Sequence, residues 1–228
     1  MPVIAAQTCD REVVTEYSST TSRAVIQHDL TADSNIYASL SEGFKAGGYA
    51  TYECTEPYDP EEVTSLEFGF KGSLGENTSL NASLFRYDYT DFQVLQVVGI
   101  QTVTRNAGDA TVNGLELEAL TNVSDSLTLN YGVTLLDATY GDFLNTNGLE
   151  PQLGVQQLEG NYLSNAPKVS VNFGLNYTNI LSSGSSLTYR ANAAYKSKIY
   201  FSEFNEYSQD AYTIVDLNLI WESADETF

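Results

Sequence analysis

The stretch KVSVNFGLNYTNILSSGSSLTYRANAAYK, residues 168–196, decides the fold class. In two runs every second side chain is apolar, from Val169 to Tyr177 and again from Leu187 to Tyr195. A period of two over about ten residues predicts a β-strand whose two faces meet different surroundings. The link Ile180–Gly184 is rich in serine and ends in glycine, which predicts a tight turn. The stretch therefore predicts an antiparallel β-hairpin.

The same alternation returns along most of the chain, and no segment shows a helical period. It predicts about nine strands, which we place at residues 22–29, 35–44, 64–71, 79–98, 111–121, 126–138, 168–178, 186–196 and 211–221. The long segment 79–98 loses its phase between Phe85 and Phe92, which indicates a β-bulge or an exit from the apolar layer. The fold class is therefore all-β.

Short and long connections alternate along the chain. Short turns are expected at residues 31–34, 74–77, 122–125 and 180–184, and long irregular loops at 45–61, 140–166 and 198–210. A tight turn at Gly99 is the one exception. In an up-and-down antiparallel meander this places the short turns at one end and the long loops at the other. Outer-membrane β-barrels have this arrangement.

The polar faces of the strands carry Ser, Thr, Asn and Gly, with single scattered charges, which suits a water-filled lumen. Tyr177, Tyr189 and Trp221 lie near short turns, where an interfacial aromatic girdle is expected. Both features favour an antiparallel up-and-down transmembrane β-barrel. A soluble β-sandwich also alternates and stays open as the second interpretation.

Composition limits the function classes. The 228 residues are 42% hydrophobic, and the net charge of −20 argues against a nucleic-acid partner. We expect no enzyme, cofactor or metal site, because no nucleophile or nucleotide motif is present and His28 is the single histidine. Cys9 and Cys54 are compatible with a disulfide or with two free thiols. No run approaches the ~20 apolar residues of a membrane helix.

Five strings resemble the TonB-dependent outer-membrane receptor family, and they occur in the order of that family. They are YASLSEGFKAGGY at 37–49, DPEEVTSLEFGFKG at 59–72, LNASLFRYDYTDFQV at 80–94, NAGDATVNGLELEA at 106–119 and LSNAPKVSVNFGLNY at 163–177. Each string matches loosely, but the ordered set covers residues 22–221 and is specific.

The resemblance implies a 22-stranded barrel in the Gram-negative outer membrane, closed by an N-terminal plug domain. It also implies uptake of a ferric-siderophore-type ligand, driven by the inner-membrane TonB complex through the plug, with membrane lipid and lipopolysaccharide as further partners. The sequence shows no plug, TonB box or signal peptide, and its C-terminal SADETF does not alternate. We therefore expect residues 1–228 to be one partial barrel domain that lacks the last strands.

Candidate ligand contacts are the aromatic residues of the long loops, because a ferric chelate is a large and partly aromatic object. They are Tyr49, Tyr52, Phe143, Tyr162, Phe201, Phe204 and Tyr207. Lys45 and Lys198 are expected to attract an anionic chelate. Glu116 and Glu118 are expected to face the lumen, where they meet water, neighbouring cations or the plug.

Three other functions remain open at this point. A passive porin or a barrel-type adhesin would use a similar barrel, and a soluble carbohydrate-binding β-sandwich would need no membrane.

Overall fold

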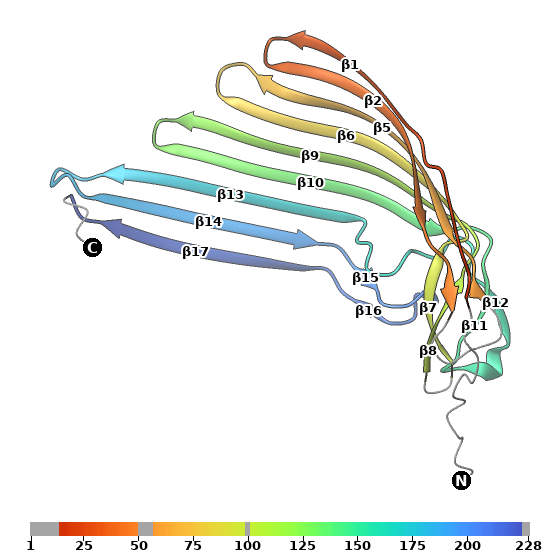
Figure 1. Cartoon of the computed structure of the whole chain (residues 1–228). Coiled ribbons are helices and arrows are strands. Elements are labelled where there is room, and N and C mark those ends of the chain that lie inside the picture. Colours follow the sequence, from red (N-terminus) through yellow and green to blue (C-terminus); the bar gives the residue numbers. More distant parts are fainter. Residues whose placement is uncertain (1–13, 50–56, 99–100, 225–228) are drawn as a thin grey trace.

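The computed structural model describes residues 14–49, 57–98 and 101–224, and of residues 97, 98, 101 and 102 only the backbone. Nine strands form one curved antiparallel sheet in the order β1-β2-β5-β6-β9-β10-β13-β14-β17 (Figure 1). They are β1 (Arg23–Thr31), β2 (Ser34–Lys45), β5 (Glu61–Leu74), β6 (Thr78–Thr90), β9 (Ala110–Ser124), β10 (Leu127–Tyr140), β13 (Val169–Ile180), β14 (Ser186–Lys196) and β17 (Tyr212–Glu222). The predicted up-and-down meander of nine strands is confirmed.

Short turns join the strands at one end of the sheet, and small hairpins fill the connections at the other end (Figure 1). The hairpins pair β3 (Gly48–Tyr49) with β4 (Pro57–Tyr58), β7 (Gln93–Val98) with β8 (Gln101–Asn106), β11 (Leu144–Thr146) with β12 (Val155–Gln157), and β15 (Ile199–Tyr200) with β16 (Ser208–Gln209). A 3-10 turn, η1 (Pro151–Leu153), links β11 to β12. No helix among the described residues is long and apolar enough to cross a membrane.

The structure corrects the sequence-based boundaries in two places. Residues 79–98 are not one strand: β6 ends at Thr90, and Asp91, with φ of 52°, turns the chain into the separate hairpin β7–β8. The connection from β6 to β9 is therefore a long one at the loop end, and short and long connections alternate between the nine described strands of the large sheet. Gly99 itself, where a tight turn was expected, lies outside the described residues. The turn predicted at residues 122–125 lies further on, because β9 continues to Ser124.

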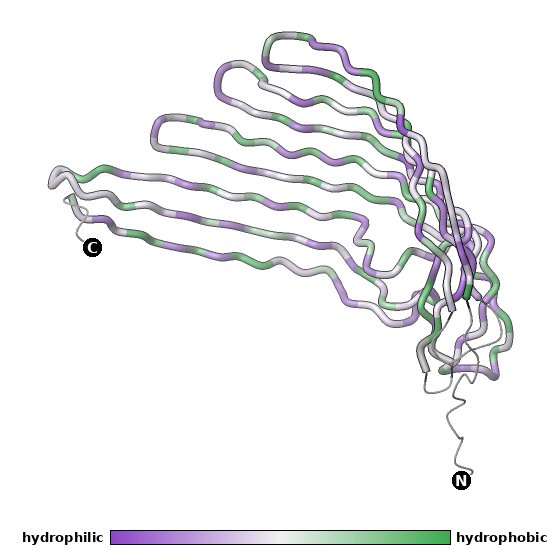
Figure 2. The backbone as a smooth tube through the Cα atoms, in the orientation of Figure 1, coloured by the Kyte–Doolittle hydropathy of each residue, from purple (hydrophilic) through white to green (hydrophobic). Residues whose placement is uncertain are grey.

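The register gives the sheet two chemically different faces. Opposite one another on the apolar face lie Ile36, Phe70, Ala82, Leu117, Val133 and Val171. The residues next to these in each strand point to the polar face. They are Tyr37, Gly69, Ser83, Glu116, Thr134 and Ser170. The alternation is visible along each strand in Figure 2.

Large side chains of the apolar face are exposed, with Leu217 at 77%, and the described residues form no second large sheet that would cover them. In β10 this face is apolar from Leu127 to Leu135, which matches the 9–11 residues of a membrane-spanning strand. Tyr177 and Tyr189 stack on the same face next to a short turn, with ring centroids 6.1 Å apart. A soluble sandwich is not supported, because its strands would pack one face against a second sheet.

The polar face turns apolar at the loop end, where the hairpins pack on it. Tyr89, Val112 and Leu136 project there from three neighbouring strands toward a buried cluster. The cluster comprises Val94, Ala107, Ala110, Ala138, Tyr140, Phe143, Leu158 and Leu163. The long loops are thus folded structures. Their hydrophobic core packs directly on the loop end of the polar face, which is the inner face of the sheet.

Two aromatic rings of the polar face lie over glycines of the next strand. A Cβ added at Gly69 would come within 2.3 Å of the Tyr37 ring, and one at Gly114 within 2.1 Å of the Phe85 ring. Phe85 has little room to move, because it is 7% exposed and stacks on Tyr87 with ring centroids 4.8 Å apart. These glycines are needed for close approach of a side chain.

We expect Gly114→Ala to destabilise the folded protein by about 1–3 kcal/mol, because the added methyl overlaps Phe85. Gly132→Ala is the matched control: it lies on the same face of the next strand, and its Cβ would meet only Leu117 O, at 3.7 Å. Urea unfolding of the membrane-inserted protein measures both variants. Equal midpoints for the two variants would contradict the packing argument.

Candidate functional site

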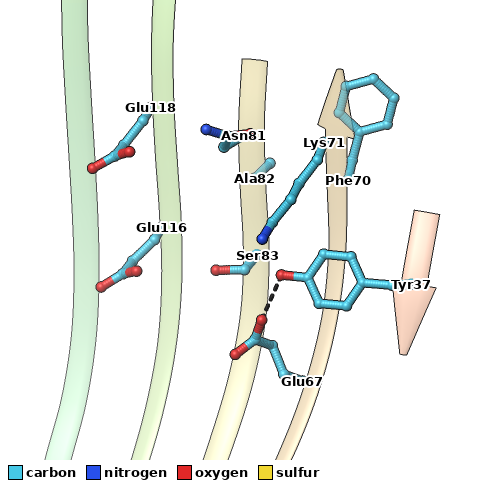
Figure 3. Close-up of a pocket in the computed structure, with 9 residues that line it drawn as sticks. All are labelled: Tyr37, Glu67, Phe70, Lys71, Asn81, Ala82, Ser83, Glu116 and Glu118. Atoms are coloured by element: carbon cyan, nitrogen blue, oxygen red, sulfur yellow. Dashed lines mark hydrogen bonds between the residues drawn. The ribbon is translucent and has the colours of Figure 1, made fainter. Parts of the chain in front are cut away.

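The polar face holds a shallow pocket of about 260 Å³ in the middle of the sheet (Figure 3). The Tyr37 hydroxyl donates a hydrogen bond to Glu67 Oε1 at 2.5 Å, and Lys71 Nζ lies 5.2 Å from the centre of the Tyr37 ring. Glu116 and Glu118 of β9 line the same pocket, with their carboxylates directed away from Tyr37 and Lys71 (Figure 3). Strand alternation puts all five side chains on one face.

The expected inward orientation of Glu116 and Glu118 is therefore confirmed. The ion pairs between described residues, Lys45–Glu61 and Arg86–Asp88, include neither of them. This wall accordingly offers two carboxylates toward the lumen, and their contact with a plug remains a prediction.

A second hollow region lies among the loop hairpins and consists of three adjoining cavities. The inner cavity of about 420 Å³ is lined from β7, β10 and the segments around Leu163 and Phe201. The middle cavity of about 150 Å³ shares Leu95, Phe201 and Glu203 with it, and shares Asn145 with an outer cavity of about 620 Å³. We call these three adjoining cavities together the loop cleft.

Asparagine side chains hold the loops around this cleft together. Asn145 Nδ2 donates to Glu203 Oε1 at 3.1 Å, and Asn147 Nδ2 donates to Glu206 Oε2 at 2.8 Å. On the other side, Asn106 Nδ2 donates to the carbonyl oxygen of Asp59 at 3.0 Å. Side chains of this kind fix loop positions across long sequence separations, so the cleft walls are preformed.

Glu203 is the one charged side chain that lines the inner and middle cavities. Burial raises the pKa of the Glu203 carboxyl, and the hydrogen bond from Asn145 opposes this effect. Next to it, the buried Oγ of Ser202 has no hydrogen-bond partner among the described residues. The cleft thus combines an apolar wall with a small number of polar groups, as ligand sites commonly do.

Three of the aromatic residues predicted as ligand contacts line the loop cleft. Phe201 lies between the inner and middle cavities and is 52% exposed, and Phe204 lines the middle cavity. Phe143 borders the outer cavity but is only 4% exposed and packs on Tyr140, with ring centroids 5.4 Å apart. The structure therefore gives Phe143 a packing role and leaves Phe201 as the exposed aromatic group, with Phe204 partly buried against the same loop core.

The structure places the other predicted contacts elsewhere. Tyr49 is part of the hairpin strand β3, Tyr207 is exposed beside β16, and neither lines these three cavities. Tyr52 lies outside the described residues, as do Cys9 and Cys54. Their roles in ligand binding or in a disulfide stay predictions.

Tyr162 faces away from the cleft. Its neighbour Leu163 is in the loop core, and Tyr162 pairs with Thr139, so its side chain points to the outer face of the sheet. There it stacks on Tyr200 with ring centroids 6.0 Å apart. Lys168 Nζ lies 3.9 Å from the centre of the Tyr162 ring.

The lysines expected to attract an anionic chelate do not face the cleft. Lys198 Nζ lies over the Tyr200 ring at 5.0 Å, and Lys45 Nζ lies 3.8 Å from a carboxylate oxygen of Glu61. Neither lysine lines the three cavities. Both ammonium groups are engaged with other side chains, and their attraction for an anionic chelate stays a prediction.

Sequence reasoning missed Leu95, Asn145 and Glu203 as cleft residues. Asn145 and Glu203 lie within the loops that were expected to bind ligand, but no pattern separates them from other loop residues of the same type. Among the described residues, no group of three or more His, Cys, Asp or Glu side chains is placed to hold a metal ion.

The chain matches the family model "TonB dependent receptor-like, beta-barrel" over residues 6–225. It is 31% identical over 147 residues to a protein of Acinetobacter baumannii described as a probable TonB-dependent siderophore receptor, PiuA. That match covers 62% of this chain and 18% of the relative.

Solved structures show the same fold. The ferric yersiniabactin uptake receptor FyuA of Yersinia pestis superposes with a TM-score of 0.73 at 21% identity, covering 89% of this chain and 30% of that one. The siderophore receptor PiuA of A. baumannii gives a TM-score of 0.65 at 23% identity, covering 86% and 28%. The chain thus spans less than a third of these relatives. It belongs to the TonB-dependent receptor-like β-barrel family, a family of transport receptors of the Gram-negative outer membrane.

Proposed function

We propose that this chain forms part of the barrel of a receptor that takes up a ferric-siderophore-type ligand across the outer membrane. The observation that carries the proposal is the preformed loop cleft at one end of a sheet whose outer face is apolar. Membership of the family supports active transport, and the curated relative is described as a siderophore receptor. The inner-membrane TonB complex would supply energy through a plug inside the barrel.

The ligand would enter from the loop end. Phe201 and Phe204 offer aromatic surface to a chelate, and the inner cavity of about 420 Å³ lies within the usual size range of small-molecule sites. The opposite end of the sheet carries only short turns.

The outer face would contact membrane lipid. Near the loops the outer face becomes polar. Arg86 pairs there with Asp88 at 2.7 Å, Lys168 lies over the Tyr162 ring and Lys198 lies over the Tyr200 ring. Cationic and aromatic side chains at this height suit the phosphate and sugar groups of lipopolysaccharide.

A passive porin or an adhesin would share the barrel but would not need energy from the inner membrane. We expect cells that rely on the complete receptor to grow on a supplied ferric siderophore under iron limitation, and to lose this growth when TonB is deleted. Growth curves with and without TonB measure the difference. Growth that persists without TonB would contradict active uptake and favour the porin.

The link between β11 and β12 can be shortened without touching the loop core. Replacing residues 148–154 by one glycine leaves Asn147-Gly as a two-residue hairpin turn between paired Thr146 and Val155. We expect weaker binding of the ferric ligand and unchanged surface expression, because this link lines the middle and outer cavities.

The matched control replaces residues 75–77, the short turn at the opposite end, by Asn-Gly. Binding of iron-55-labelled chelate to whole cells compares the two variants. If the β11–β12 variant binds as tightly as the parent, this link is not part of the binding site.

Lipid contact can be tested with two adjacent residues of β13. Val171 lies on the apolar face opposite Val133, and Asn172 lies on the polar face opposite Gly132. We expect Val171→Arg to destabilise the inserted barrel by about 2–4 kcal/mol, because the charge would enter hydrocarbon. Asn172→Arg places the same charge in water. Urea unfolding in lipid bilayers measures both, and equal losses would contradict the membrane assignment.

A further inference from the structure

The loops that surround the cleft carry a distinctive charge pattern. The described loop residues, 46–49, 57–60, 91–98, 101–109, 141–168 and 197–211, contain the cations Arg105, Lys168 and Lys198. They contain three times as many acids: Asp59, Asp91, Asp109, Asp142, Glu150, Glu159, Glu203, Glu206 and Asp210. A surface with this excess of one sign repels ligands of the same sign and concentrates those of the opposite sign.

The placement of the cations strengthens this asymmetry. Lys168 and Lys198 lie on the outer side, over Tyr162 and Tyr200. Arg105 borders the outer cavity, and no Lys or Arg lines the inner or middle cavity. The deeper half of the cleft therefore presents one charged group, the carboxylate of Glu203.

Glu203 is poised to receive a hydrogen-bond donor. Its carboxylate accepts a side-chain hydrogen bond from Asn145 and one from its own backbone N–H, and neither ion pair between described residues involves it. A carboxylate has room for about four hydrogen bonds. The neighbouring Oγ of Ser202, buried and without a partner in the described structure, adds a second polar group to the same wall.

A half-buried carboxylate of this kind is costly to leave without a counter-charge. Burial raises the pKa of Glu203, which is the direction expected where no cation offsets the loss of water. A ligand that brings an ammonium or another strong donor would remove that cost. A ligand that brings carboxylates or catecholate oxygens would increase it.

We propose that Glu203 makes the loop cleft select ferric chelates that are neutral or carry a cationic group, and reject polyanionic ones. This inference rests on the proposed function, because it names the ligand class of the same receptor. The aromatic surface of Phe201 and Phe204 contacts the body of the chelate, and Glu203 pairs with a protonated amine or a hydroxyl at its edge.

Three iron-loaded probes test the charge preference on the purified full-length receptor. The first is a linear ferric tris-hydroxamate that carries a free ammonium, the second is the same compound with that amine acetylated, and the third is a ferric tris-catecholate with three negative charges. Equilibrium binding of iron-55 gives a Kd for each. We expect the ammonium compound to bind at least about tenfold more tightly than its acetylated form, and the tris-catecholate to bind weakest.

Glu203→Gln keeps the shape of the side chain and removes its charge. We expect this variant to lose the tenfold preference for the ammonium over the acetylated compound. Glu159→Gln is the control, because Glu159 is an exposed loop carboxylate that does not line the three cavities. It should retain the preference.

The outcomes distinguish the proposed charge selectivity from the proposed uptake of ferric chelates. Tight binding of the tris-catecholate, or equal Kd values for the ammonium and acetylated compounds in the parent receptor, would overturn the charge selectivity while leaving ferric-chelate binding intact. An unchanged preference in Glu203→Gln would overturn the role of this residue. Failure of all three probes to bind would count against the proposed function and the selectivity together. If Glu203→Gln does not assemble, the order of the three Kd values in the parent still decides the selectivity.

Discussion

The register of the antiparallel ladder is the constraint on which the rest of this structure depends. Side chains alternate between two faces with a period of two, so a slip of one residue between β9 and β10 would carry Glu116 and Glu118 to the apolar face. That slip would also turn Leu117 toward water, while Val133 on β10 would keep its face. The preference of each face for its own surroundings therefore fixes the pairing of neighbouring strands, and with it the position of every loop.

The inner face changes its chemistry along the strands without changing its register. In the middle of the sheet it carries Tyr37, Glu67 and Glu118, which suit water. Toward the loops the same face carries Tyr89 and Leu136, which pack against the buried loop core. The same face is thus a polar surface in the middle of the sheet and the packing surface for the folded loops at the loop end. The loop cleft can be preformed because its inner wall is the sheet itself.

Much of the fold could be predicted from sequence because alternation is a local signal. The alternation in residues 168–178 and 186–196 predicted two strands that the structure contains as β13 and β14. The position of Glu116 and Glu118 on the polar face followed from their spacing in the sequence. The loss of phase between Phe85 and Phe92 indicated a bulge or an exit from the apolar layer, but the end of the strand at Thr90 depends on the backbone turning at Asp91 and on apolar packing of β7 against the loop core. The polar residues Arg86 and Asp88 blurred the phase there, yet both belong to the outer face of β6.

The candidate site was predicted less completely, because loop residues acquire their roles through tertiary contacts. Seven aromatic residues were expected as ligand contacts, but aromatic character does not distinguish Phe143, which is needed in the core, from Phe201, which is accessible. The orientation of Tyr162 depends on its pairing with Thr139, which is not visible in the sequence. Glu203 gains significance only from its position between two cavities.

The arrangement of charge follows from the same geometry. A long ammonium side chain gains little from an apolar cleft wall, but it can lie over an exposed tyrosine ring with its charge still in water, as Lys168 and Lys198 do. Carboxylates of the loops cannot use such rings, since the ring face is itself negative. They are held instead by amides, as Glu203 is by Asn145 and Glu206 is by Asn147. Lys168 and Lys198 thus lie on the outer side, whereas Glu203 and Glu206 are held among the loops on the inner side.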